Sequence, residues 1–236
     1  MVISEAFSRG FETYKKHFLD LLILGFSKLV IPVAFIVASL ILLLPVLGLS
    51  NWFQVVAYGI GYVLFIVAAF FMALPFFIYP VVSGSVIALK KRPKIETVFV
   101  NIRDNYQKLL LDVVIYFSIV IFLLIESIAI MFVFPILGTV AFIAAIYVAM
   151  RLYFWDVLLF FGEKHPLRAS WELTEGRAFT VLAFLTVSTV FAYFLGLMSI
   201  VPFFGPMIGL SLIPFFVTSK VHFVKLLREG LKKSRA

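Results

Sequence analysis

Four charged residues lie inside apolar runs that are long enough to cross a membrane, and they are the side chains best placed for specialised chemistry. They are Lys28, Glu126, Arg151 and Asp156. A charge at the centre of a bilayer costs roughly 2.5–3.5 kcal/mol on insertion scales, so such a side chain is expected to face a bundle interior or water. The sequence therefore predicts an intramembrane polar cluster formed by these four residues.

Arg151 is the expected centre of this cluster, with Glu126 as its partner on another helix and Lys28 at a similar depth. Asp156 is expected to reach Arg151 only obliquely, because five residues separate them on one helix. Two interpretations stay open. The first is a structural ion pair that fixes helix register, with Lys28 reaching toward the interface. The second is a pocket in which Arg151 and Lys28 contact an anionic head group.

A second candidate set follows in the polar segment after this run and consists of Arg168, Ser170, Trp171 and Glu172. Pro166 suits the first position of a helix and Gly176 the position just past its end. Arg168 and Glu172 have the i,i+4 spacing of an ion pair on one helix face. We expect a short cytoplasmic-side helix whose Trp171 either anchors in the membrane interface or docks a partner.

Most other chemistry is disfavoured by the residues present. The chain has no cysteine, and its three histidines are far apart in sequence without the spacing of a metal site. Neither a phosphate-binding glycine loop nor a nucleophile motif is found. The net charge of +8 comes from basic residues that flank apolar runs, so no nucleic-acid partner is expected. The sequence predicts no catalytic residue, no cofactor, no bound metal and no enzyme activity.

The composition places these side chains in a polytopic membrane protein. Hydrophobic residues make up 64% of the chain and charged residues 14%, whereas soluble domains have about 45–50% and about 25%. We expect an all-α fold in which residues 1–236 form a single membrane domain with six spans. The expected spans are 19–46, 52–89, 108–133, 139–162, 179–200 and 207–224. Kinks are expected at Pro75 and Pro80, and a helix break at Ser83-Gly84-Ser85.

Three amphipathic helices are expected beside the spans, because apolar residues recur at steps of three and four in segments 3–18, 95–109 and 166–175. Lys and Arg concentrate in segments 90–108 and 163–177 and at both chain ends, while the turns near 49, 136 and 203 carry no charge. The positive-inside bias therefore predicts cytoplasmic termini in a cell membrane. The expected partners are the lipid bilayer and its anionic head groups.

The chain also has a probable three-fold internal repeat, with units of about 1–92, 93–163 and 164–236. Each unit is an amphipathic helix followed by a helical hairpin, and Asp20 aligns with Asp112. Arg151 takes the place that Pro75 and Pro214 hold in the other units, and Asp156 takes the place of Pro80. The units share one orientation, unlike the inverted repeats of many carriers. Shared composition and helix periodicity remain the alternative explanation.

The chain resembles a family of uncharacterised prokaryotic six-span membrane proteins related to the membrane domain of some glycerophosphodiester phosphodiesterases. The resemblance rests on Arg151 followed by segment 166–177, on Pro80 and Gly84 before a basic loop, and on Pro214 before the closing basic helix. It covers nearly the whole chain and implies a six-span fold, but it implies no reaction. The catalytic domain of those phosphodiesterases has no counterpart in these 236 residues.

Two functions are consistent with this sequence. The first is a non-enzymatic integral membrane protein that acts as a scaffold or accessory component, either as a homo-oligomer or with another membrane protein. The alternative is a transporter or a lipid-handling protein with a polar pocket around Arg151. A dry, internally paired Arg151 favours the first function, and a cavity that reaches Arg151 favours the second.

Overall fold

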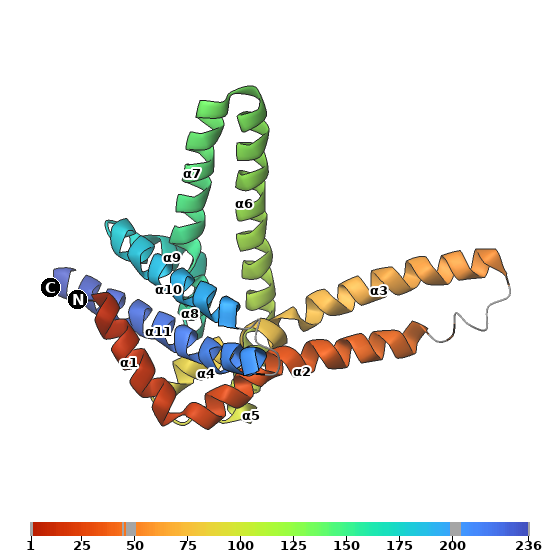
Figure 1. The fold of residues 1–236 in the computed structure, drawn as a ribbon, viewed down its shortest axis with the longest axis horizontal. Coiled ribbons are helices and arrows are strands. Elements are labelled where there is room, and N and C mark those ends of the chain that lie inside the picture. Colours follow the sequence, from red (N-terminus) through yellow and green to blue (C-terminus); the bar gives the residue numbers. More distant parts are fainter. Residues whose placement is uncertain (1, 44, 46–50, 199–203, 236) are drawn as a thin grey trace.

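The computed structural model describes residues 2–43, 45, 51–198 and 204–235, without the side chains of 27–31, 43, 53, 71, 195–198, 204–210 and 232–235. The described residues are helical and include no strand, which confirms the all-α class (Figure 1). The helices are α1 (Val2–Lys16), α2 (Phe18–Leu43), α3 (Trp52–Ile78), α4 (Pro80–Ala88), α5 (Ile95–Asp104), α6 (Tyr106–Val133), α7 (Pro135–Leu152), α8 (Trp155–Phe160), α9 (Pro166–Thr174), α10 (Ala178–Met198) and α11 (Phe204–Arg235).

Several of these helices have the length and composition of membrane spans. Within the described residues, three helical stretches qualify: Gln54–Ala88, Tyr106–Val133 and Pro135–Phe160. A fourth span results if α9 and α10, which are bent by 105° relative to each other, count as one broken span. The chain is therefore a helical protein with three to four clear candidate spans, because about 20 apolar residues cross a bilayer core.

Two long hairpins, α2–α3 and α6–α7, project from a central helical body in different directions (Figure 1). Their large apolar side chains are mostly exposed, and Phe132 and Ile136 at the tip of α6–α7 are 86% and 85% exposed. Such surfaces are typical of contact with lipid. Short interruptions join each hairpin to the body: His17 and Tyr79 for α2–α3, and Asn105 and Tyr153–Phe154 for α6–α7.

The core of the body forms where α4, α8 and α11 contact one another, and α1, α9 and α10 pack around them. Phe184 of α10 stacks on Phe223 of α11 with ring centroids 4.2 Å apart, and Phe154 packs against both rings. All three side chains are fully buried. Burial of aromatic surface of this size is a major source of stability wherever water is excluded.

The three amphipathic segments are confirmed as helices α1, α5 and α9. The apolar face of α1 lies on α11, where Ala6, Gly10 and Tyr14 are buried at steps of four residues. Thr13 Oγ1 and His222 Nε2 lie 2.8 Å apart in a hydrogen bond that links the same two helices. The apolar face of the amphipathic helix α1 therefore packs on α11.

Two predicted spans are interrupted in the structure. The predicted span 52–89 is divided at Tyr79 into α3 and α4, next to the expected kink at Pro80. The break expected at Ser83-Gly84-Ser85 was wrong, because these residues lie inside α4. Their helix is fixed by packing: a Cβ on Gly84 would lie 2.4 Å from Leu24 Cδ1, and Ser83 Oγ accepts a hydrogen bond from Asn101.

The predicted span 139–162 is likewise divided, into α7 and α8, by Tyr153 and Phe154. The uncharged turn expected near residue 136 is tighter than predicted, since Phe134 alone separates α6 from α7. The turns expected near residues 49 and 203 lie largely outside the described residues.

The tight α6–α7 hairpin leads to a test of packing. A Cβ on Gly138 would lie 2.3 Å from Met131 Cα, a backbone atom that cannot move independently. Gly138→Ala should therefore destabilise the protein by about 1–3 kcal/mol, the usual cost of overpacking. Thermal unfolding in detergent measures it, and Gly59→Ala, with open space around the new Cβ, is the control. Equal unfolding temperatures for the two variants would contradict the close approach.

Candidate functional site

Arg151 is buried in the last turn of α7 and makes all its described polar contacts with neutral groups. Its side chain donates from Nε to Thr174 Oγ1 at 3.1 Å, from Nη1 to the Tyr147 hydroxyl at 3.3 Å, and from Nη2 to the Trp171 carbonyl at 2.6 Å. The guanidinium also lies 4.0 Å from the centre of the Trp171 ring. Arg151 therefore fastens α7 to α9.

The end of α9 explains why an arginine fits here. The last carbonyls of a helix have no partner within the helix, and a positive charge is favoured at that end. The Trp171 carbonyl is one of these groups, because α9 ends at Thr174. Gly176, which the sequence placed just past the end of this helix, takes a left-handed conformation with φ of 67°. Arg151 thus acts as a side-chain cap for α9.

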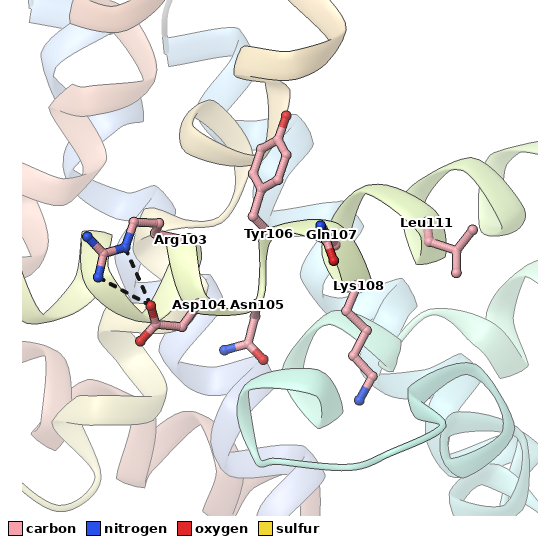
Figure 2. A pocket seen from close by; sticks show the side chains of 7 residues that line it. All are labelled: Arg103, Asp104, Asn105, Tyr106, Gln107, Lys108 and Leu111. Atoms are coloured by element: carbon pink, nitrogen blue, oxygen red, sulfur yellow. Dashed lines mark hydrogen bonds and ion pairs between the residues drawn. The ribbon is translucent and has the colours of Figure 1, made fainter.

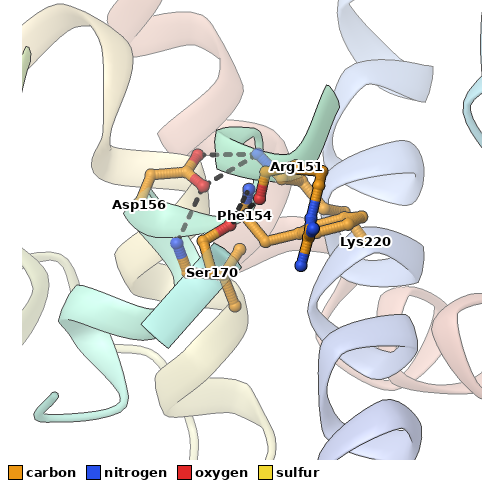
Figure 3. Close-up of polar contacts among 6 residues, drawn as sticks. Arg151, Phe154, Asp156, Ser170 and Lys220 are labelled. Carbon is orange, nitrogen blue, oxygen red and sulfur yellow. Dashed lines mark hydrogen bonds and ion pairs between the residues drawn. The ribbon is translucent and has the colours of Figure 1, made fainter. Parts of the chain in front are cut away.

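Ser170 satisfies backbone groups at the interruption between α7 and α8. Its Oγ donates to the Arg151 carbonyl at 2.7 Å and accepts a hydrogen bond from the Phe154 N–H at 3.2 Å (Figure 3). Both interactions are buried, so leaving either backbone group unpaired would be costly. The predicted i,i+4 ion pair of Arg168 with Glu172 is confirmed at 2.8 Å on the exposed face of α9.

Asp156 forms a buried ion pair with Lys220 of α11. Lys220 Nζ donates to both carboxylate oxygens at 2.8 Å, and each residue is 8% exposed (Figure 3). Asp156 Oδ1 also accepts the N–H of Val157 at 2.8 Å, in the first turn of α8 where a negative charge is favoured. Lys220 Nζ lies 3.9 Å from the centre of the Tyr153 ring. The pair therefore ties α8 to α11.

A cavity of about 280 Å³ lies beside this ion pair. Its walls come from the end of α3, from α4, α6, α8 and α11, and from the interruption before α8. Six of its lining residues carry polar atoms: Tyr79, Tyr116, Tyr153, Trp155, Asp156 and Lys220. Arg151 is not among the residues that line it. The cavity is therefore aromatic, with one neutralised pair of charges.

Two surface hollows occur at the bends between an amphipathic helix and a long helix. The first has a volume of about 580 Å³ and lies at the α5–α6 bend between Arg103 and Leu111 (Figure 2). The second, of about 510 Å³, lies at the α1–α2 bend and includes Asp20 and Arg92. The Asp20 carboxylate is hydrogen-bonded to Arg92 and raises the pKa of that guanidinium. Both hollows are open depressions of the surface, so neither is an enclosed binding site.

Glu126, Arg151 and Asp156 of the predicted cluster are not partners of one another in the structure. Arg151 and Glu126 form no ion pair among the described residues, because Arg151 turns to α9 and Glu126 lies exposed on α6. The expected partnership of these two residues was therefore wrong. Asp156 faces Lys220 instead of Arg151, since the interruption at residues 153–154 separates α8 from α7. The side chain of Lys28 lies outside the described residues.

Lys220 is the functional candidate that the sequence analysis missed. It lies inside the predicted span 207–224, directly after the uncharged run that ends at Ser219. In the repeat alignment Ser219 corresponds to Asp156, so Lys220 is one position from the aspartate's place. This near match in the alignment could have suggested an ion pair of Asp156 with Lys220, between the second and third predicted units.

No group of three or more His, Asp or Glu residues in the described part of the chain could hold a metal ion. Burial together with Lys16 lowers the pKa of His17. Comparisons of the chain with protein families, with curated proteins and with solved structures found no match. The relation to the membrane domain of glycerophosphodiester phosphodiesterases therefore stays a prediction.

Proposed function

We propose that this chain is a non-enzymatic integral membrane protein that acts as a scaffold or accessory component. The observation that carries the proposal is the state of Arg151: it is 7% exposed, and its guanidinium is bound by α9 and Tyr147. A cation whose donors are engaged within the protein is suited to holding helices together. Its role in a pathway for an anionic head group is correspondingly disfavoured.

Vesicles provide the test of this proposal. The purified chain is reconstituted into liposomes that contain a fluorescent phospholipid, and dithionite reports the exchange of that lipid between leaflets. We expect the same exchange in vesicles with the protein as in protein-free vesicles. Exchange that is faster with the wild-type protein and returns to background in Arg151→Leu would overturn the proposal in favour of a lipid transporter.

The proposal includes six spans formed by α2, α3, α6, α7, α10 and α11. Supporting this, α2, α3 and α6 have 26, 27 and 28 residues, and α10 has 21. These lengths meet the requirement of about 20 residues for one crossing. The 18 residues of α7 are extended by α8, and α11 has 32 residues.

The same proposal keeps the three-fold repeat. The order of a short helix, a long hairpin and a closing helix occurs as α1 to α4 and again as α5 to α8, while α9 to α11 repeats it with the last two elements fused. The closing elements α4, α8 and the second half of α11 are mutual neighbours. The hollow that includes Lys15, Lys16 and Leu19 also aligns with the hollow that includes Gln107, Lys108 and Leu111.

Topology reporters test the proposed orientation in the cell membrane. Alkaline phosphatase, which is active only outside the cytoplasm, is fused after residue 236 or inserted near residue 49. We expect activity only for the insertion near residue 49, because Lys and Arg cluster at both chain ends while that turn is uncharged. Activity of the fusion after residue 236 would contradict cytoplasmic termini.

A further inference from the structure

Three tyrosines line the cavity beside Lys220, and the described residues supply no hydrogen-bond partner for their hydroxyls. Tyr79, Tyr116 and Tyr153 all line it, and none of their hydroxyls makes a hydrogen bond within the described part of the chain. Elsewhere the chain satisfies such groups: the hydroxyls of Tyr14, Tyr62 and Tyr106 donate to backbone carbonyls. Three phenols on side chains that line one cavity are therefore groups that a ligand could engage.

The charge of the cavity restricts the chemistry of that ligand. Among the described residues that line it, only Asp156 and Lys220 are ionised, and their charges cancel. Both carboxylate oxygens already accept hydrogen bonds from the ammonium group. A net negative head group would bring an unpaired charge into a mainly apolar space, which is strongly unfavourable. The site therefore favours an uncharged group that can both donate and accept hydrogen bonds.

The mouth of the cavity indicates where the ligand comes from. Phe117 and Tyr153, which line it, are 47% and 38% exposed, and Ile78 beside them is 36% exposed. Phe117 belongs to α6, one of the apolar candidate spans. A ligand that enters past these side chains has to be soluble in lipid. The aromatic walls suit the aliphatic C–H groups of a compact polyol.

We propose that this cavity binds the head group of an uncharged, hydroxyl-bearing lipid, whose acyl chains lie along the exposed surface of α6. The phenols of Tyr79, Tyr116 and Tyr153 hydrogen-bond the head-group hydroxyls, and the spare N–H of Lys220 donates to a head-group oxygen. Asp156 keeps Lys220 in place and the site neutral. The site is independent of Arg151, so it can exist in a scaffold and in a lipid-handling protein alike.

Native mass spectrometry with lipids of identical acyl chains tests the proposal. The full chain in detergent is mixed separately with dioleoylglycerol, with dioleoylphosphatidic acid and with dioleoylphosphatidylethanolamine, and the bound fraction is measured against lipid concentration. We expect at least about tenfold tighter binding of dioleoylglycerol than of either phospholipid, which corresponds to the loss of one hydrogen bond. Free glycerol, tested in parallel, should not compete at the same concentration, because it lacks the acyl chains.

Conservative tyrosine variants locate the binding. Tyr79→Phe and Tyr116→Phe keep the rings and should each weaken dioleoylglycerol binding by about tenfold, the value of a lost hydrogen bond. Tyr193→Phe, at an exposed ring on α10, is the matched control and should bind like the wild type. Tighter binding of phosphatidic acid would assign the cavity to an anionic lipid and overturn the proposal. If all lipids bind equally and the variants bind like the wild type, lipid binding is non-specific and the proposal is also overturned.

Discussion

Lys220→Met should lower the free energy of unfolding by about 3–5 kcal/mol, because it leaves a buried charge without its partner. The substitution removes the ammonium group that donates to both oxygens of Asp156 at 2.8 Å. The carboxylate then stays buried between α8 and α11 with no opposite charge. Reversible unfolding in mixed micelles, followed by tryptophan fluorescence during a titration with sodium dodecyl sulfate, measures the change.

Two further variants show whether the ion pair is the cause. Lys220→Met combined with Asp156→Leu should regain most of the loss, because an apolar pair leaves no buried charge behind. Arg168→Met breaks the exposed pair with Glu172 and should cost less than about 1 kcal/mol. A double variant as unstable as Lys220→Met alone would argue that Lys220 acts through its packing and not through its charge.

Arg151→Leu should destabilise the protein by about 3–6 kcal/mol, mainly by releasing α9. The variant loses hydrogen bonds to Thr174 and to the Trp171 carbonyl, and bonds that involve a charged donor are worth about 1.5–3 kcal/mol each. The released helix should become accessible to trypsin, which cleaves after Lys164 and Arg168. Limited proteolysis of the purified protein, with fragments identified by mass spectrometry, gives the cleavage rate at these positions.

The choice of second substitution distinguishes a helix cap from an ion pair. Adding Glu126→Leu should not rescue Arg151→Leu, because the two side chains are not partners in the structure. Arg151→Lys should be more stable than Arg151→Leu but less stable than the wild type. One ammonium group cannot reproduce the planar guanidinium or its stacking on Trp171. Recovery of protease resistance in the double variant would restore the ion-pair explanation and contradict the cap.

Local features of the fold could be predicted because they depend on neighbours in the sequence. The limits of α9 followed from Pro166 and Gly176, and its surface ion pair followed from the spacing of Arg168 and Glu172. The helical periodicity of segment 3–18 likewise located α1. In each case the decisive interaction lies within about four residues along the chain, so no knowledge of the tertiary structure was needed.

The partners of the buried charges could not be predicted in the same way. Which helix faces Arg151 depends on the rotation of α7 about its own axis and on the interruption at Tyr153–Phe154. The sequence of a helix that is apolar all round carries little information about this rotation. The search for an opposite charge on another helix led to Glu126, whereas the structure supplies neutral groups of α9. Lys220 was overlooked because its place near the end of a predicted span resembled that of an interfacial lysine.

The divergent hairpins have a mechanical consequence. Helices that cross one flat bilayer tilt by about 20° on average, so α2–α3 and α6–α7 can share a bilayer only after their axes become nearly parallel. Each hairpin is joined to the body by two short interruptions, His17 with Tyr79 and Asn105 with Tyr153–Phe154. Any change in the angle between the hairpins would therefore be taken up at these interruptions, where backbone hydrogen bonds such as Leu21 N–H to the His17 carbonyl and Ser83 N–H to the Tyr79 carbonyl continue the helices.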